Sequence, residues 1–235
     1  GSFLNVCIYR IPRGESIAFP GSHCTTCNTT LKAIDLIPIL SYGLNRGRCR
    51  YCGDKISPQY PLIEGLNGFL YILIYLKMGL TPYTITLMLL SSILIVITMI
   101  DIQHQIIPDS LNIGIILLGI IQLFIGLGPS VISRIIGLLI GGGFFFIIAI
   151  VTNGNMGGGD IKLMGALGFI FGYKMILLIS LLSFVLGSII SIGLLISKKV
   201  TRRDFIAFGP FIALASYIAI LYGYPMIQIY IKCFI

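Results

Sequence analysis

From residue 62 onward, the chain alternates between long apolar runs and short polar segments. Each run has about 18 to 23 residues, which at 1.5 Å per residue lets a helix cross a hydrocarbon core of roughly 30 Å. Transmembrane β-strands would be about half that length and would alternate in polarity. The pattern therefore predicts an all-α bundle, with spans at residues 62–80, 83–100, 110–127, 131–151, 174–196 and 205–222.

Three other apolar segments are too short for a full crossing. Residues 160–172 would form roughly 18 Å of helix, so we expect a tilted or half-buried segment there, and residues 226–235 are shorter still. Residues 1–9 are expected to be the end of a first span whose earlier turns lie upstream, although the Gly-Ser pair is also typical of a cloning remnant. We expect about seven to eight spans, the first one truncated.

Composition agrees with a polytopic membrane protein. Of the 235 residues, 57% are hydrophobic and 10% are charged, and the mean hydropathy of +1.01 is far above that of a soluble domain. The net charge of +8 is spread over short loops rather than one face, so nucleic acid is not an expected partner. If residues 10–60 are cytoplasmic, only Lys77, Arg134, Lys174 and Lys232 of the 16 basic residues lie outside, in accord with the positive-inside rule.

Residues 10–61 form the longest polar stretch and contain two Cys-x-x-Cys pairs. Four thiolates from two such pairs suit a tetrahedral zinc ion, so we predict a cytoplasmic zinc-binding loop domain ahead of the membrane core at 62–235. Two disulfides are the alternative, but a reducing cytosol disfavours them. We expect His23 to be solvated, and the isolated Cys7 and Cys233 to pack as apolar side chains. The predicted ligands are Cys24, Cys27, Cys49 and Cys52.

Three aspartates, Asp101, Asp109 and Asp160, fall at the cytoplasmic ends of predicted spans. An ionisable group at membrane depth costs a few kcal/mol and usually marks a functional site. Asp109 follows Pro108 and precedes a helical run, so helix capping is the favoured interpretation for it and a weaker alternative for Asp160. Asp101 ends a helix, at the negative pole of the helix dipole, so capping does not explain it.

Two carboxylates that meet in a desolvated site can hydrolyse a peptide bond. They share a proton, so that one acid accepts a proton from water while the other donates to the scissile carbonyl oxygen. Asp101 and Asp160 would form this pair if their helix ends converge. Gly157, Gly158 and Gly159, which precede Asp160, would let a substrate backbone approach closely. Within the run 131–151, Gly137, Gly141, Gly142 and Gly143 predict close helix packing instead.

Several of these segments, in this order along the chain, resemble the type IV prepilin peptidases, a branch of the GxGD-type membrane aspartyl proteases. The paired Cys-x-x-Cys loop is similar to the zinc-binding insertion of that family, and Asp101 and Asp160 stand in segments that resemble its two catalytic motifs. The further similar segments are residues 1–10, 60–64 and 208–211, and the two motifs cover residues 101–109 and 157–162.

The resemblance implies that Asp101 and Asp160 are catalytic acids in a bacterial cytoplasmic membrane, with the active site on the cytoplasmic side. It implies a pilin-like precursor as substrate, cut after a short basic leader beside the lipid bilayer, with Asp109 and Lys162 near its path. Family members with four cysteines also methylate the new N-terminus with S-adenosylmethionine. Glu64 is a candidate for that cofactor site, and an interfacial glutamate that extends to water is the alternative.

The sequence also allows three other functions. A protease of the presenilin or signal-peptide-peptidase type resembles the chain at Asp160 but lacks the cysteine loop. A cation-coupled transporter would use Asp101 and Asp160 to bind a proton or cation near broken helices. A zinc-bearing scaffold would need neither carboxylate.

Overall fold

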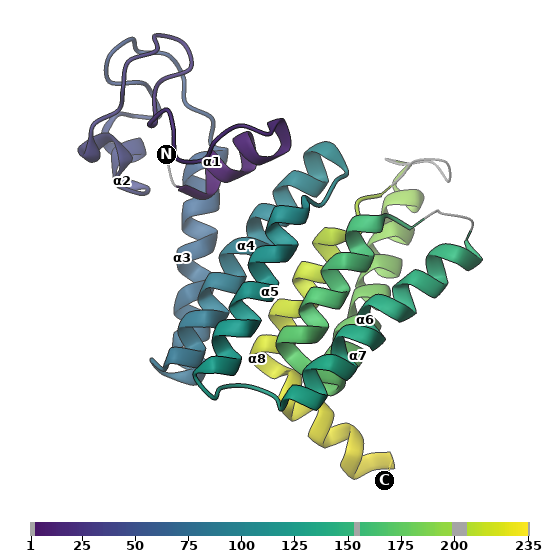
Figure 1. The fold of residues 1–235 in the computed structure, drawn as a ribbon. Helices are drawn as coiled ribbons and strands as arrows, with labels where there is room; N and C mark the ends of the chain where they lie inside the picture. Colours follow the sequence, from purple (N-terminus) through teal and green to yellow (C-terminus); the bar gives the residue numbers. More distant parts are fainter. Residues whose placement is uncertain (1–2, 153–155, 199–205, 235) are drawn as a thin grey trace. The chain divides into compact units, whose positions relative to one another are not determined.

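The computed structural model describes residues 3–152, 156–198 and 206–234, and these residues form helices connected by loops (Figure 1). The described residues contain no β-strand, only two isolated bridges. The all-α prediction is therefore confirmed. The elements are α1 (Phe3–Arg10), η1 (Ile11–Arg13), η2 (Ala33–Leu36), α2 (Leu40–Leu44), α3 (Gln59–Met78), α4 (Pro82–His104), α5 (Asp109–Phe124), α6 (Val131–Val151), α7 (Gly158–Ile196) and α8 (Gly209–Phe234).

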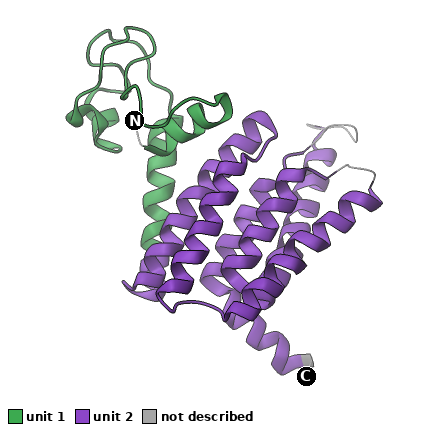
Figure 2. Ribbon diagram, viewed as in Figure 1, with its two compact units in different colours: residues 1–73 green, residues 74–235 purple. Residues whose placement is uncertain are grey.

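The chain divides into two compact units, Gly1–Leu73 and Ile74–Ile235 (Figure 2). The first unit holds α1, the cysteine-rich loops and most of α3. The second holds the rest of the helices, with an aliphatic core of fully buried side chains such as Leu94, Ile97 and Leu163. The division falls inside α3, twelve residues after the boundary that the polar-to-apolar transition at residues 61 and 62 predicts.

Four of the described helices, α4, α6, α7 and α8, are long and apolar enough to cross a membrane by length and composition. The prediction of a multi-pass membrane protein is therefore confirmed. α5 is apolar but has only 16 residues. α3 covers most of the predicted span 62–80 but is not among the four, because Glu64, Asn67 and Lys77 lower its mean hydropathy.

α7 is two helices that meet at Gly172, where φ is 76° and ψ is 174°. A Cβ at Gly141 of α6 would lie 2.9 Å from the carbonyl carbon of Met164 and 3.0 Å from Cγ1 of Ile176. In a straight helix these two residues would be about 18 Å apart. The chain therefore reverses at Gly172, as the separate apolar runs 160–172 and 174–196 predict, and glycine permits the positive φ there.

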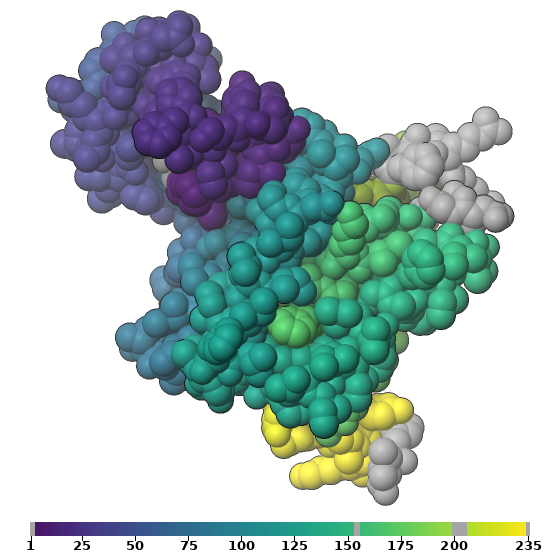
Figure 3. Space-filling model, in the orientation of Figure 1, coloured from purple at the N-terminus to yellow at the C-terminus, as the bar shows by residue number. Residues whose placement is uncertain are grey.

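α6 packs on the first segment of α7, residues 158–171, through glycine backbone. A Cβ at Gly137 would lie 2.8 Å from the carbonyl carbon of Gly172, and one at Gly168 would lie 3.0 Å from the nitrogen of Leu138. Gly143 differs, since nothing lies within 4 Å of its Cβ position. α7 also packs against α5 and α8, and atoms of α7 are visible between α5 and α6 in the space-filling view (Figure 3).

Arg134, which the charge distribution places on the outer side of the predicted span 131–151, is fully buried in α6. Its guanidinium donates to the carbonyl oxygens of Leu127 at 2.7 Å, Pro129 at 3.1 Å and Phe169 at 3.2 Å. It also donates to Oε1 of Gln122 at 3.3 Å. Arg134 thus satisfies carbonyls at the end of the first α7 segment and in the α5–α6 loop, where helix C-termini leave acceptors unpaired.

We predict that Gly137→Ala lowers the melting temperature of the detergent-solubilised protein, because the added methyl would force α6 and α7 apart. Overpacking of this kind costs about 1–3 kcal/mol. Gly143→Ala is the matched control in the same helix. It should leave stability unchanged or raise it by up to about 1 kcal/mol, because alanine is the better helix former. Equal melting temperatures for the two variants would contradict the proposed backbone contact.

Candidate active site and metal centre

Asp101 lies in the last turns of α4 and is only 5% exposed. Its Oδ2 accepts a hydrogen bond from the backbone amide of Gly209, the first residue of α8, at 2.8 Å. A helix N-terminus carries unpaired amides and a positive partial charge, which favour a carboxylate. The N-terminus of α8 therefore offsets the unfavourable position of Asp101 at the end of its own helix.

Asp160 lies in the first turn of α7 and is 9% exposed. Its Oδ1 is buried and has no hydrogen-bond partner among the described residues. The carboxylates of Asp101 and Asp160 are near enough to interact electrostatically. The second unit thus brings together two buried acids that lie 59 positions apart in the sequence.

Ile107 connects the segments that carry the two acids. A Cβ at Gly159 would lie 2.8 Å from Cβ of Ile107, and a Cβ at Gly209 would lie 3.3 Å from its Cδ1. The backbones of α7 and α8 therefore approach this side chain closely from two directions, and a larger residue at position 159 would collide with it. The α4–α5 connection that contains Ile107 begins at Gln105, in the left-handed region with φ of 54°.

The three glycines before Asp160 have different surroundings. Gly157 is the N-cap of α7 with φ of −65°, and none of the three has a positive φ. Gly159 is small because Ile107 packs on it, whereas nothing lies within 4 Å of the Cβ position of Gly158. The backbone is therefore open to an approaching chain at Gly158, and conformational freedom does not explain the glycines.

Asp109 forms an ion pair with Lys162 across α5 and α7. The Lys162 Nζ lies 2.8 Å from both carboxylate oxygens. Pro108 occupies the N-cap position of α5 and no side chain forms a cap hydrogen bond, so the predicted N-cap role of Asp109 is wrong, although Asp109 does lie in the first turn, where the helix dipole favours a carboxylate. The side chains of Lys162 and Asp109 are 57% and 63% exposed, and an exposed pair of this kind contributes at most about 1 kcal/mol.

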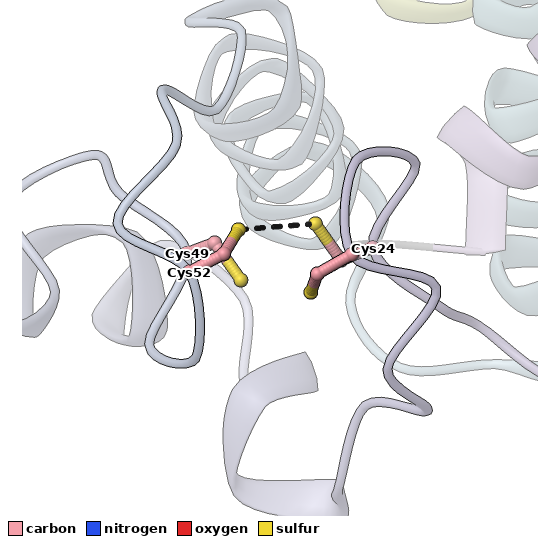
Figure 4. A group of neighbouring side chains, drawn as sticks. Cys24, Cys49 and Cys52 are labelled. Carbon is pink, nitrogen blue, oxygen red and sulfur yellow. Dashed lines mark hydrogen bonds between the residues drawn. The ribbon is translucent and has the colours of Figure 1, made fainter.

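The four predicted metal ligands of the first unit come together. The sulfurs of Cys24, Cys27, Cys49 and Cys52 all lie within 4.8 Å of one another. Cys24, Cys49 and Cys52 converge from two facing loops, and Cys24 Sγ is 3.9 Å from Cys52 Sγ (Figure 4). With Zn–S bonds of about 2.3 Å, the sulfurs of a tetrahedral site stand about 3.8 Å apart. The cluster has the donors and size that zinc requires.

The two loops repeat one backbone design. Cys24 donates its amide to the Thr29 carbonyl at 3.0 Å, and Cys49 donates to the Asp54 carbonyl at 2.7 Å. Each turn contains a residue with positive φ, Asn28 at 54° and Gly53 at 74°. All four cysteines are free, so the disulfide alternative is not formed. His23 is not a member of the sulfur cluster, and its Nδ1 lies 3.1 Å from the Gly21 carbonyl oxygen.

Hydrogen bonds prepare two of the thiols for a metal. The hydroxyl and backbone amide of Thr29 lower the pKa of Cys27 to about 6. The backbone amides of Cys52 and Tyr51 lower the pKa of Cys49. Because the thiolate is the form that binds a metal, these contacts favour binding by Cys27 and Cys49, whereas desolvation and the neighbouring thiols raise the pKa of Cys52 to about 12.

The first unit also contains a partly open cavity of about 880 Å³, within the size range of small-molecule sites. Its lining includes the buried Arg10 of α1, which donates to the Ser16 carbonyl at 2.9 Å. Glu64 of α3 lines it as well, and its Oε2 accepts the backbone amide of Ile39 at 2.7 Å. Glu64 is therefore tied into the first unit rather than extended freely to water. Ile39 has a φ of 60°, a costly conformation for a β-branched residue.

Two protein-family models match the chain, one over its N-terminal part and one over its helical core. Residues 1–78 match a family model described as the bacterial peptidase A24 N-terminal domain, and residues 88–192 match that of the type IV leader peptidase family. No solved structure matches.

Three similar curated proteins share one name, prepilin leader peptidase/N-methyltransferase. The protein from Bacillus subtilis (strain 168) is 33% identical over 232 residues, which cover 99% of this chain and 94% of the relative. The protein from Aeromonas hydrophila is 31% identical over 264 residues, which cover 100% of this chain and 91% of the relative. The protein from Pseudomonas putida is 31% identical over 250 residues, which cover 95% of this chain and 87% of the relative.

Proposed function

The chain belongs to the type IV leader peptidase family, and from this premise we propose that Asp101 and Asp160 carry out the peptide hydrolysis. The family favours a leader peptidase and N-methyltransferase over the intramembrane protease, the transporter and the scaffold. One observation supports the two residues most directly. Asp160 is buried beside a second carboxylate and keeps an oxygen without a partner among the described residues, a costly arrangement unless substrate or water uses it.

The two acids have complementary surroundings. The Gly209 amide fixes the orientation of Asp101 through Oδ2, while Oδ1 of Asp160 is free to hold a water molecule. Two adjacent carboxylates hold one proton between them at lowest cost. One acid then takes a proton from the attacking water, and the other donates its proton to the oxygen of the scissile carbonyl. No covalent intermediate with the protein is required.

We propose that the substrate is a pilin-like precursor with a basic leader followed by a hydrophobic helix. The leader stays in water and the helix enters the bilayer, so the bond between them lies at the membrane surface. Asp101 and Asp160 are within a few residues of the ends of apolar helices, at the same level. This arrangement favours an active site at the cytoplasmic face of a bacterial inner or plasma membrane, with Gly158 and the Asp109–Lys162 pair beside the substrate path.

We predict that Asp101→Asn and Asp160→Asn each reduce cleavage of a pilin-like precursor by a factor of about 1,000 or more, because neither amide can exchange the proton. Cleavage is measured in detergent by the mass shift of the precursor. His104→Gln is the control, since His104 is exposed and one turn from Asp101. Precursor processing that survives in both aspartate variants would rule out the proposed pair.

We also propose that Cys24, Cys27, Cys49 and Cys52 hold one structural zinc ion. The ion would join the two loops, which bury few apolar side chains of their own, and its binding energy would stabilise the fold of the first unit. The ligand set has no open position for chemistry, so the zinc would not take part in hydrolysis.

Elemental analysis should find one zinc per chain, and Cys24→Ser should remove most of it because three thiolates bind the ion more weakly. Cys7→Ala is the control, since Cys7 is buried in α1 of the same unit and is not in the cluster. Loss of zinc should lower the protease resistance of residues 10–61 while the melting transition of the helical core stays unchanged. A chain that retains full zinc after Cys24→Ser would contradict the assignment.

S-adenosylmethionine is the methyl donor that the methyltransferase activity requires, and we propose the cavity of the first unit as its site. The buried Arg10 has donors beyond its bond to Ser16, and a guanidinium suits the carboxylate of the donor. Glu64 supplies a negative charge for its amine or sulfonium group, and Tyr9 and Tyr51 offer aromatic surface for adenine.

Glu64→Gln should weaken S-adenosylmethionine binding by about tenfold in calorimetry, because the charge is lost while an acceptor for the Ile39 amide remains. Methylation of a pre-cleaved pilin peptide should fall with it, and precursor cleavage should not. Asp160→Asn provides the reciprocal control, with cleavage lost and binding retained. Unchanged affinity in Glu64→Gln would place the methyl donor elsewhere.

A further inference from the structure

Asn112, on α5, is a buried amide that no partner satisfies. The residue is 6% exposed, and neither Nδ2 nor Oδ1 has a hydrogen-bond partner among the described residues. An asparagine side chain offers two donors and one strong acceptor, and a buried polar group that stays unpaired is costly. A leucine of similar size would pack there without that cost, so the amide calls for a functional explanation.

Asn112 lies on the interior face of α5. The buried residues of this helix, which recur at helical spacing, include Asn112, Ile115, Gly119 and Gln122. Gly119 packs against Phe169 and Ile170 of α7, and Asp109 binds Lys162 of α7. α5 and the first segment of α7 therefore run parallel with an offset of 50 to 53 residues, so Asn112 is level with residues 162 to 165.

This register places Asn112 close in depth to the active site. Asp160 precedes residues 162 to 165 by two to five positions, which corresponds to roughly 3–8 Å along a helix. Buried side-chain atoms without partners occur among the described residues at Asp160, Asn112 and Ser91. Ser91 stands ten residues before Asp101 on α4, roughly 15 Å deeper. Asn112 is thus closer in depth to the active site than Ser91 is, on the side toward the membrane interior.

We propose that Asn112 binds a peptide group of the substrate on the hydrophobic side of the scissile bond. The inference rests on the proposed hydrolysis by Asp101 and Asp160. A protease can act only on an extended backbone, so the first turn of the substrate helix has to unwind at the site. Unwinding leaves amide and carbonyl groups unpaired at a depth where no bulk water satisfies them.

The amide of Asn112 is complementary to such a group. Its Nδ2 can donate to a substrate carbonyl, and its Oδ1 can accept from a substrate N–H. Binding would satisfy both partners at once and hold the chain extended past the carboxylates. Asn112 would therefore be a substrate-binding residue. The free energy lost by burying its unpaired amide in the free enzyme would be regained when the substrate forms hydrogen bonds with it.

The first test compares Asn112→Leu with Ser91→Ala, which removes an unpaired polar atom farther from the site. Both variants should melt at or above the temperature of the wild type. Asn112→Leu should lower kcat/KM for precursor cleavage about tenfold or more, because substrate amides lose their partner. Ser91→Ala should cleave within about twofold of the wild type. A stable Asn112→Leu variant that cleaves as well as Ser91→Ala would overturn the proposal.

The second test uses the wild-type enzyme and therefore does not depend on how a variant folds. Synthetic precursors carry one backbone ester in place of one of the first four or so peptide bonds after the cleavage site, about one helical turn. One ester should slow wild-type cleavage several-fold, and the same ester should have little further effect in Asn112→Leu. If no ester slows the wild type, the proposal fails. Failure of the proposed hydrolysis is separate, since cleavage would then persist in Asp160→Asn.

Discussion

The hydrogen bond from the Gly209 amide to Asp101 is the contact on which the arrangement of the second unit depends. It joins residues 108 positions apart and connects the end of α4 to the beginning of α8. The α4 dipole disfavours an acid at position 101, and the unpaired amides at the start of α8 provide the compensation. An acid is therefore stable at membrane depth because a second helix begins beside it. Removal of the acid would leave the N-terminus of α8 without its acceptor.

The reversal at Gly172 limits the segment of α7 that carries Asp160 to a short helix. A continuous 39-residue helix would carry the end of α7 far beyond the bundle, whereas the reversal returns it to the face where α8 begins. Such a short first segment can be positioned only by close packing, and the bare backbones of Gly137 and Gly168 provide it. Arg134 then donates to the Phe169 carbonyl oxygen, which the break leaves without its helical partner. The glycine contacts, the break at Gly172 and the buried Arg134 therefore act together to position the first segment of α7.

The sequence predicted the parts whose signal lies in side chains. Apolar runs predicted the helices, the break near residue 172 and the membrane class, and the cysteine spacing predicted the cluster that the structure brings together. The partner of Asp101 could not be predicted, because the donor is a backbone amide and carries no residue signature. The burial of Arg134 could not be predicted for the same reason, since its acceptors include main-chain carbonyls. Asp109 does not cap α5 because Pro108 takes the N-cap position, and the partner of Asp109, Lys162, comes from another helix and could not be predicted from neighbouring residues.

One oxygen of Asp160 and the amide of Asn112 are buried without hydrogen-bond partners among the described residues, and the same physical argument applies to both. Each buried polar group left without a partner costs about 1–3 kcal/mol, a large share of the stability of a typical domain. Ordinary packing would remove such groups, yet Asp160 Oδ1 and the Asn112 amide are unpaired and lie within roughly 8 Å of each other in depth. A soluble protease can leave its groups to water, which satisfies them cheaply. Inside an apolar helical bundle, a ligand that pairs with such groups explains them, and Asn112 on α5 and Asp160 on α7 would then lie along the path of the substrate backbone.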